Sequence, residues 1–222
     1  MRPSVRDIWL EFNEPLEART RWMYLDIRGF VTTAIGLLID ATRTPLQEPN
    51  DAERAASHQL ARRLAWQLPD GSPAGSAEID EEWDNVTAMM DLAPQGGGTF
   101  EDRTSLRIDD DEVDRVVFEK LDEMESVLIG REPFADFADF PADAQPGLLS
   151  MSSGMGPNFR FPKFQAFVTD GDWAGAATEC RFNPDKGTIK TRNDRNQQLF
   201  RNAAAVMADE SDPDVLVWPD TA

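Results

Sequence analysis

The spacing of apolar residues changes within the first 36 residues, and this change limits the possible folds more than any other feature of the sequence. Apolar side chains first recur at helical spacing, at Val5, Ile8, Trp9, Phe12 and Leu16. This spacing predicts an amphipathic helix with Glu17 at or beyond its end. Residues 22–26 and the β-branched run Phe30–Gly36 then flank a turn at Ile27–Gly29, which predicts a β-hairpin.

The remainder of the chain returns to helical patterns. Expected helices cover residues 51–66, 76–90, 109–129, 143–155, 161–169, 172–182 and 192–208. The longest of these begins with the acids Asp109–Glu112, which favour a helix start, and continues as an apolar stripe to Leu128. Together these patterns predict an α+β fold. No internal repeat or linker separates independent domains.

Charge narrows the range of partners. The chain has 22 Lys and Arg against 41 Asp and Glu, a net charge of -19, which argues against nucleic acid as a partner. Residues 157–202 reverse the balance with eight bases and five acids, so this segment suits anionic groups. Residues 209–222 are expected to form an acidic tail. No apolar stretch is long enough to span a bilayer, so we expect no membrane insertion.

Single residues exclude several chemistries. Cys180 is the only cysteine and His58 the only histidine, so there is no internal disulfide and any zinc site or catalytic triad would depend on one imidazole. We expect neither a metal nor a cofactor. The first residues lack the apolar run of a secretory signal, which predicts synthesis in the cytoplasm.

Three side chains near the N-terminus suit glycosidic bond cleavage. Glycoside hydrolysis needs one carboxyl that stays protonated and a second that stays ionised. Glu17 follows an apolar helical face, where desolvation is expected to raise its pKa, whereas Asp26 starts a polar turn and should stay charged. Thr32 would orient a water molecule. The alternative is that these are ordinary structural residues in an acid-rich chain.

The spacing Glu17-(eight residues)-Asp26-(five residues)-Thr32, with Tyr24 and Gly29 between, resembles the active-site signature of the phage-type lysozymes. A second block is similar to the central and C-terminal helices of that family. It consists of Asp143-Ala144-Gln145, Leu148-Leu149-Ser150-Met151, Met155-Gly156, Phe161, Trp173, Ala176, Ala177, Thr191-Arg192-Asn193 and Arg195.

This resemblance implies a lysozyme-like fold with a cleft between two lobes. A small N-terminal lobe of about residues 1–105 would contain an inserted helical segment at about 41–105. A connecting helix at about 109–129 would lead to a helical C-terminal lobe at about 130–208, so that residues 1–208 form a single lysozyme-like domain.

The resemblance also implies an activity, that of a muramidase cleaving the β-1,4 bond between N-acetylmuramic acid and N-acetylglucosamine in peptidoglycan. Glu17 would be the general acid, Asp26 the electrostatic stabiliser or base, and Thr32 the residue that positions the attacking water. Four further side chains are candidates for substrate binding: Tyr24, Leu38, Ser153 and Phe164.

Several positions depart from the family pattern. Leu37 replaces a histidine, Ala18 and Ala34 replace glycines, and Ser153-Gly154 replaces an aromatic-glutamine pair of the substrate groove. The altered groove leaves open a second reading, a catalytically inactive cell-wall-binding or structural module of a phage tail or an injection or secretion apparatus.

The partners expected from the enzymatic reading are peptidoglycan glycan strands, a delivery machine and an immunity protein. The site of action would then be the cell wall, in the periplasm or outside the producing cell, after delivery by a phage tail or a secretion system. Such a protein would act as a bacteriolytic, antibacterial effector.

Overall fold

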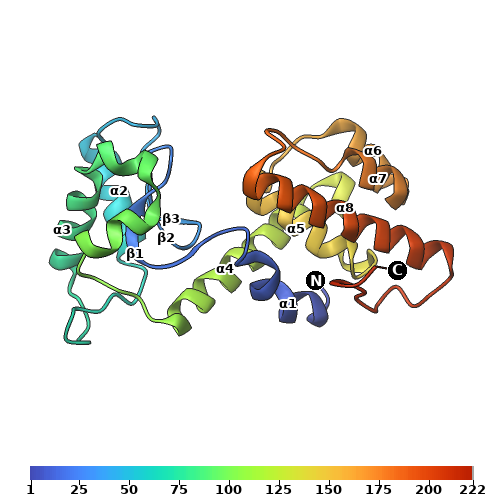
Figure 1. The fold of residues 1–222 in the computed structure, drawn as a ribbon, viewed down its shortest axis with the longest axis horizontal. Helices are drawn as coiled ribbons and strands as arrows, with labels where there is room; N and C mark the ends of the chain where they lie inside the picture. The colour runs from blue at the N-terminus through green and yellow to red at the C-terminus, as the bar shows by residue number, and fades with distance from the viewer. Residues whose placement is uncertain (222) are drawn as a thin grey trace. The chain divides into compact units, whose positions relative to one another are not determined.

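A computed structural model describes residues 1–221 and shows an α+β protein (Figure 1). The chain divides into two compact units. One, here called the sheet unit, is Glu17–Phe118; the other, the helical unit, combines Met1–Leu16 with Glu119–Ala222. The predicted α+β class is therefore confirmed, and residues 1–16 group with the helical unit.

The sheet unit contains a three-stranded antiparallel sheet in the order β1-β2-β3. The strands are β1 (Arg19–Leu25), β2 (Val31–Ile35) and β3 (Leu37–Leu38). The predicted hairpin between β1 and β2 is confirmed. The sequence did not predict β3, because two residues after the turn at Gly36 are too few to show an alternating pattern.

Two helices follow the sheet in the sequence. They are α2 (Asp51–Ala61) and α3 (Ser76–Thr87), and both end before the predicted residues 66 and 90. α3 packs against β1 and β2, and α2 packs against α3. α2 begins with a capping box between Asn50 and Glu53. The fully buried Trp83 ties α3 to the chain beyond β3 by donating from its indole N–H to the Ile39 carbonyl (2.9 Å). Two 3₁₀ helices, η1 (Met90–Gln95) and η2 (Gly97–Arg103), follow.

The long predicted helix is present as α4 (Asp110–Ile129). The Asp109 carboxylate accepts a hydrogen bond from the Glu112 amide (2.8 Å) at its first turn, as expected from the acids there. Its apolar stripe is buried at Val113, Val116, Val117, Leu121, Met124 and Leu128. The division between the two units falls within this helix, after Phe118.

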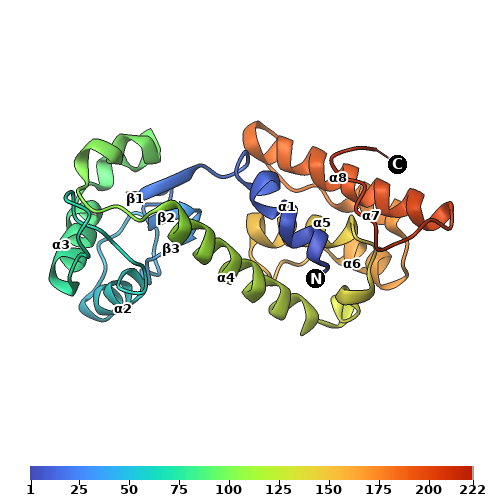
Figure 2. The same ribbon diagram turned by 90° about the horizontal axis from the view of Figure 1, so that it is seen from below.

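The helical unit is built around α5 (Figure 2). Its elements are α1 (Pro3–Asn13), η3 (Glu132–Phe134), η4 (Phe137–Asp139), α5 (Ala144–Met155), α6 (Pro162–Thr169), α7 (Trp173–Glu179) and α8 (Gly187–Ala208). α5 is buried from Ala144 to Ser152. Gly147 lets α8 approach closely, since a Cβ there would lie 2.8 Å from the Phe200 ring.

The first and last segments of the chain are bound to this unit. The Arg2 amide donates to the Gln145 side chain (2.8 Å), and the Arg195 guanidinium donates to the Phe12 carbonyl. Residues 209–221, expected as an acidic tail, are folded back here: the buried Asp143 carboxylate accepts the amides of Val217 (2.8 Å) and Trp218 (3.0 Å). Among residues 1–221, no helix is both long and apolar enough to cross a membrane.

Candidate functional site

Glu17 is the first residue of the sheet unit. α1 ends at Asn13, and a turn closed by the Leu16 amide and the Asn13 carbonyl (2.9 Å) brings the chain to Glu17. The half-buried carboxylate reaches the turn between β2 and β3, where one oxygen lies 3.4 Å from the position that a Cβ of Gly36 would take. Gly36 also has φ +68, so this turn favours glycine for its backbone and leaves room for the Glu17 carboxylate.

The strand register places three of the candidate residues in one row. Tyr24 pairs with Thr32, and Thr32 pairs with Leu38. Because directly paired residues point to the same face of a sheet, all three side chains lie on one face. Leu38 is 49% exposed, so this face reaches solvent at β3.

Tyr24 links the two candidate carboxylates. Burial raises the pKa of its phenol, and the negative charges of Glu17 and Asp26 raise it further. Both carboxylates therefore lie within electrostatic reach of the ring hydroxyl. At neutral pH the phenol keeps its proton and can donate a hydrogen bond.

Asp26 shapes the hairpin turn and is held by it. One carboxylate oxygen accepts the amides of Arg28 (2.8 Å) and Phe30 (2.9 Å), and the Asp26 amide donates to the Phe30 carbonyl (2.9 Å). Gly29 provides the left-handed residue that the turn requires, with φ +78. These bonds fix the direction of the carboxylate.

Thr32 is buried, and its hydroxyl donates to the Phe30 carbonyl (3.1 Å). This bond uses the hydroxyl proton, so the oxygen lone pairs remain available as acceptors. Thr32 is thus held on the row between Tyr24 and Leu38.

The inserted segment supplies one wall of the site, which the sequence did not predict. A Cβ on Gly97 would lie 2.9 Å from the Tyr24 ring, so this glycine lets the backbone of η2 pack directly on the ring. The Trp22 indole donates to the Gly97 carbonyl (2.9 Å) and fixes the contact. The run Gly96-Gly97-Gly98 was the available signal, because glycine permits such close approach.

The other two substrate-binding candidates belong to the helical unit. Ser153 is half-buried near the end of α5. Phe164 is fully buried, with its ring centroid 5.2 Å from that of Phe200 and 6.3 Å from that of Phe159. A ring enclosed by other rings cannot contact a glycan in this structure, so Phe164 is a core residue.

Two further positions named in the sequence analysis have a clear structural outcome. Ala34 has φ +53, so its backbone adopts the left-handed conformation that glycine favours. Gly154 has no room for a side chain, because a Cβ would lie 2.8 Å from the Phe182 ring and 3.1 Å from Arg192.

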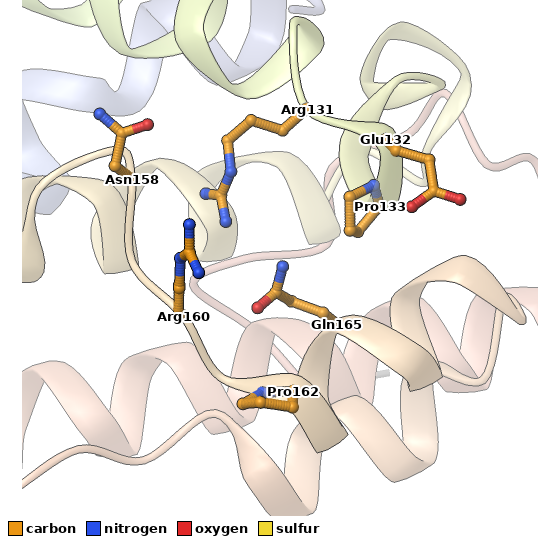
Figure 3. A pocket seen from close by; sticks show the side chains of 7 residues that line it. All are labelled: Arg131, Glu132, Pro133, Asn158, Arg160, Pro162 and Gln165. Carbon is orange, nitrogen blue, oxygen red and sulfur yellow. The ribbon is translucent and has the colours of Figure 1, made fainter.

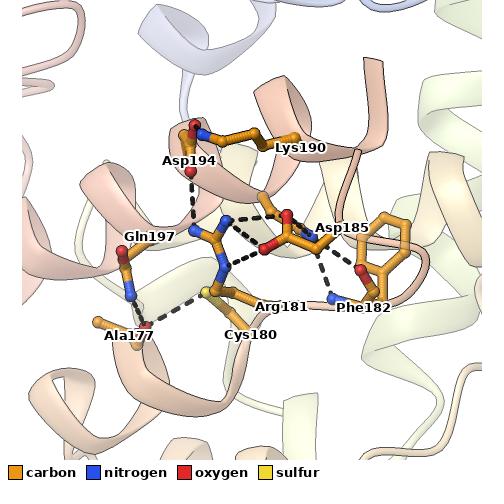
Figure 4. Close-up of polar contacts among 9 residues, drawn as sticks. Ala177, Cys180, Arg181, Phe182, Asp185, Lys190, Asp194 and Gln197 are labelled. Atoms are coloured by element: carbon orange, nitrogen blue, oxygen red, sulfur yellow. Dashed lines mark hydrogen bonds and ion pairs between the residues drawn. The ribbon is translucent and has the colours of Figure 1, made fainter. Parts of the chain in front are cut away.

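Two charged clusters elsewhere consist of ion pairs within the protein. His58 lies between Asp84 (3.1 Å) and Asp80 (3.5 Å) and joins α2 to α3. In the basic segment, Arg181 pairs with Asp185 and Asp194 (each 2.8 Å), and Lys190 pairs with Asp194 (2.5 Å) (Figure 4). Within the part of the chain that the structure describes, no group of three or more His, Cys, Asp or Glu side chains could hold a metal ion.

Compared with known proteins, the sequence matches no family model and no curated protein at a significant level. The chemistry of the site is therefore the basis for a functional assignment.

Proposed function

We propose that this protein is a peptidoglycan hydrolase, a muramidase that cleaves the β-1,4 bond between N-acetylmuramic acid and N-acetylglucosamine. The arrangement around Tyr24 carries the proposal. Two carboxylates from different segments, Glu17 and Asp26, lie in electrostatic reach of one phenol, and Thr32 lies directly opposite that phenol on the next strand. Glycoside hydrolysis uses such a pair of carboxyl groups.

In the proposed mechanism, Glu17 donates its proton to the leaving glycosidic oxygen. Asp26, oriented by two backbone amides, stabilises positive charge on the sugar ring or activates the water. Thr32 accepts a hydrogen bond from the attacking water through its free lone pairs. Tyr24 keeps its proton and donates to a substrate oxygen.

We further propose that the fold is lysozyme-like. Support comes from elements in the expected order: the hairpin, the long helix α4, and α5 ending at Met155-Gly156. Ala34 adds independent support, because its left-handed backbone fits the glycine of the family pattern. Asn193, in the Thr191-Arg192-Asn193 block, binds both the amide (3.1 Å) and the carbonyl (2.8 Å) of Phe182, which gives this block a structural role.

The decisive experiment is digestion of purified peptidoglycan sacculi with analysis of the released muropeptides. We expect the wild-type protein to release them and Glu17→Gln to lose activity by at least about a hundredfold, because the glutamine amide cannot act as a general acid. Glu48→Gln is a matched control, since Glu48 is an exposed acid of the same unit. Wild-type protein that binds sacculi without releasing products would contradict the proposal.

A second candidate, a non-catalytic cell-wall-binding module, is favoured by Gly154. Its packing against Phe182 and Arg192 leaves no space for the glutamine that lines the groove in phage-type lysozymes. Sedimentation with sacculi separates the two functions, because a binding module would remain bound and leave the glycan intact.

The biological context follows from the proposed substrate. Action on the cell wall would require delivery by a phage tail, a secretion apparatus, a holin or lysis, and an immunity protein would protect the producing cell. Fractionation of producing and target cells tests this proposal. Protein that stays in the cytosol of producers under all conditions would argue against it.

A further inference from the structure

A hollow of about 660 Å³ opens on the helical unit between η3 and the segment leading into α6 (Figure 3). Its polar lining consists of Arg131, Glu132, Asn158, Arg160 and Gln165. The guanidinium groups of Arg131 and Arg160 face one another there, and the Glu132 carboxylate lies on the opposite side in this view. Neither arginine forms an ion pair with a carboxylate anywhere in residues 1–221.

Arg131 is rigidly held. Its guanidinium donates to the carbonyls of Pro157 (2.6 Å) and Phe159 (2.5 Å). It also lies over the rings of Phe134 (4.8 Å) and Phe159 (5.0 Å). A guanidinium has five N–H donors, so donors remain for a ligand after these two bonds, and their direction is already fixed.

Arg160 adds a second, uncompensated charge. Its side chain is exposed. Burial lowers the pKa of Arg131, and the charge of Arg160 lowers it further, so the two cations repel each other. This contrasts with Arg181 and Lys190, whose charges are neutralised by neighbouring acids.

Two amides complete the rim. The Gln165 oxygen accepts the Phe161 amide (2.9 Å), which leaves the NH₂ of Gln165 as a donor. The side chain of Asn158 is exposed and also borders the hollow. Donors therefore outnumber acceptors around a space lined by two positive charges, those of Arg131 and Arg160, and one negative charge, that of Glu132.

We propose that this hollow binds a phosphomonoester as its dianion. Guanidinium forks match phosphate oxygens in geometry. A phosphomonoester dianion brings two negative charges and three terminal oxygens to the two facing forks, whereas a carboxylate or a phosphodiester brings one charge and two such oxygens. The hollow belongs to the helical unit and Glu17 to the sheet unit, and this proposal does not depend on the proposed glycosidase activity.

The test is a titration of the full-length, ¹⁵N-labelled protein with glycerol 3-phosphate at about pH 8, where a phosphomonoester is a dianion. We expect saturable shifts of the amide signals of residues 131 and 157–165. Arg160→Gln should weaken binding at least about tenfold. Arg63→Gln is the matched control, because Arg63 is exposed and does not line the hollow. This variant should bind glycerol 3-phosphate with the same affinity as the wild type.

Dimethyl phosphate and acetate at equal ionic strength test the charge requirement, and both should bind at least about tenfold more weakly. Equal binding of these monoanions, unsaturable shifts, or unchanged affinity in Arg160→Gln would each overturn the proposal. Thermal denaturation of Arg160→Gln checks that the variant is folded. If it is not, Arg160→Lys replaces it, with weaker binding expected because an ammonium lacks the planar fork.

Discussion

At the scale of single residues, the loops around the candidate site depend on left-handed backbone positions. Gly29 closes the hairpin turn, Gly36 closes the turn beneath Glu17, and Ala34 takes the same region without being glycine. Such positions store backbone strain for any residue with a Cβ. At Gly29 a side chain is also excluded by packing, because an added Cβ would overlap the side chains of Met90 and Leu46 from the inserted segment.

Gly29→Ala should therefore destabilise the protein more than Gly71→Ala. Both glycines have similar backbones, φ +78 and φ +83, and an alanine in this region costs about 1–2 kcal/mol. Only at Gly29 would the new Cβ overlap neighbours, at 2.5 Å from the Met90 sulfur, which adds about 1–3 kcal/mol. Urea unfolding of both variants measures the difference, and equal losses would show that the packing at Gly29 adapts freely.

At the scale of elements, the first turn of α4 is fastened to the segment after α2. The Glu112 carboxylate accepts the Ala65 amide (2.9 Å) and two N–H groups of Arg115 (each 2.6 Å). The hydrogen bond from Arg115 lowers the pKa of Glu112, with a smaller contribution from the Ala65 amide, against the opposing effect of burial. This cluster links residues 47 positions apart in the chain.

We expect Glu112→Gln to lower the free energy of unfolding by about 1–3 kcal/mol at neutral pH. Because the pKa of Glu112 is lower in the folded state, its stabilisation exists above the unfolded pKa and is lost as the pH falls through the folded value. The variant should thus approach wild-type stability as the pH falls through the folded-state pKa of Glu112. Urea unfolding at neutral pH and at a series of acidic pH values tests this.

Glu123→Gln provides the control on the same helix. Glu123 is 67% exposed and pairs with Lys120 (3.5 Å), so its loss should change stability by less than about 1 kcal/mol. A constant destabilisation of Glu112→Gln across the whole pH range would contradict the role of its charge.

At the scale of the whole molecule, the net charge of -19 bears on the proposed substrate. Peptidoglycan is itself anionic, so long-range repulsion slows encounter at low salt. If the protein is a muramidase, its activity on sacculi should rise between about 0.01 and 0.15 M salt, as the screening length falls from about 30 to about 8 Å.

The control substrate is sacculi whose carboxylates have been chemically amidated, on which salt should have little effect. A steady fall of activity with salt on native sacculi would instead indicate that local positive charges, such as those of Arg131 and Arg160, dominate the encounter.

The sequence by itself determined the elements whose signals are local. The apolar stripe of α4, the buried run of α5 and the hairpin around Gly29 were predictable because neighbours along the chain decide these patterns. The candidate site was predictable only in part: the positions of Tyr24 and Thr32 follow from the hairpin, whereas the direction of the Glu17 side chain does not.

Only the tertiary structure decided what depends on contacts between distant segments. α8 begins at Gly187, five residues before the predicted start, because its first turn is largely exposed and so shows no apolar periodicity. Phe164 belongs to an aromatic core that sequence spacing cannot reveal. The buried Asp143 gathers Asn202 and the amides of residues 217 and 218, and Gly97 reaches Tyr24 from the inserted segment. Such contacts form only after the chain has closed long loops, so no local pattern in the sequence specifies them.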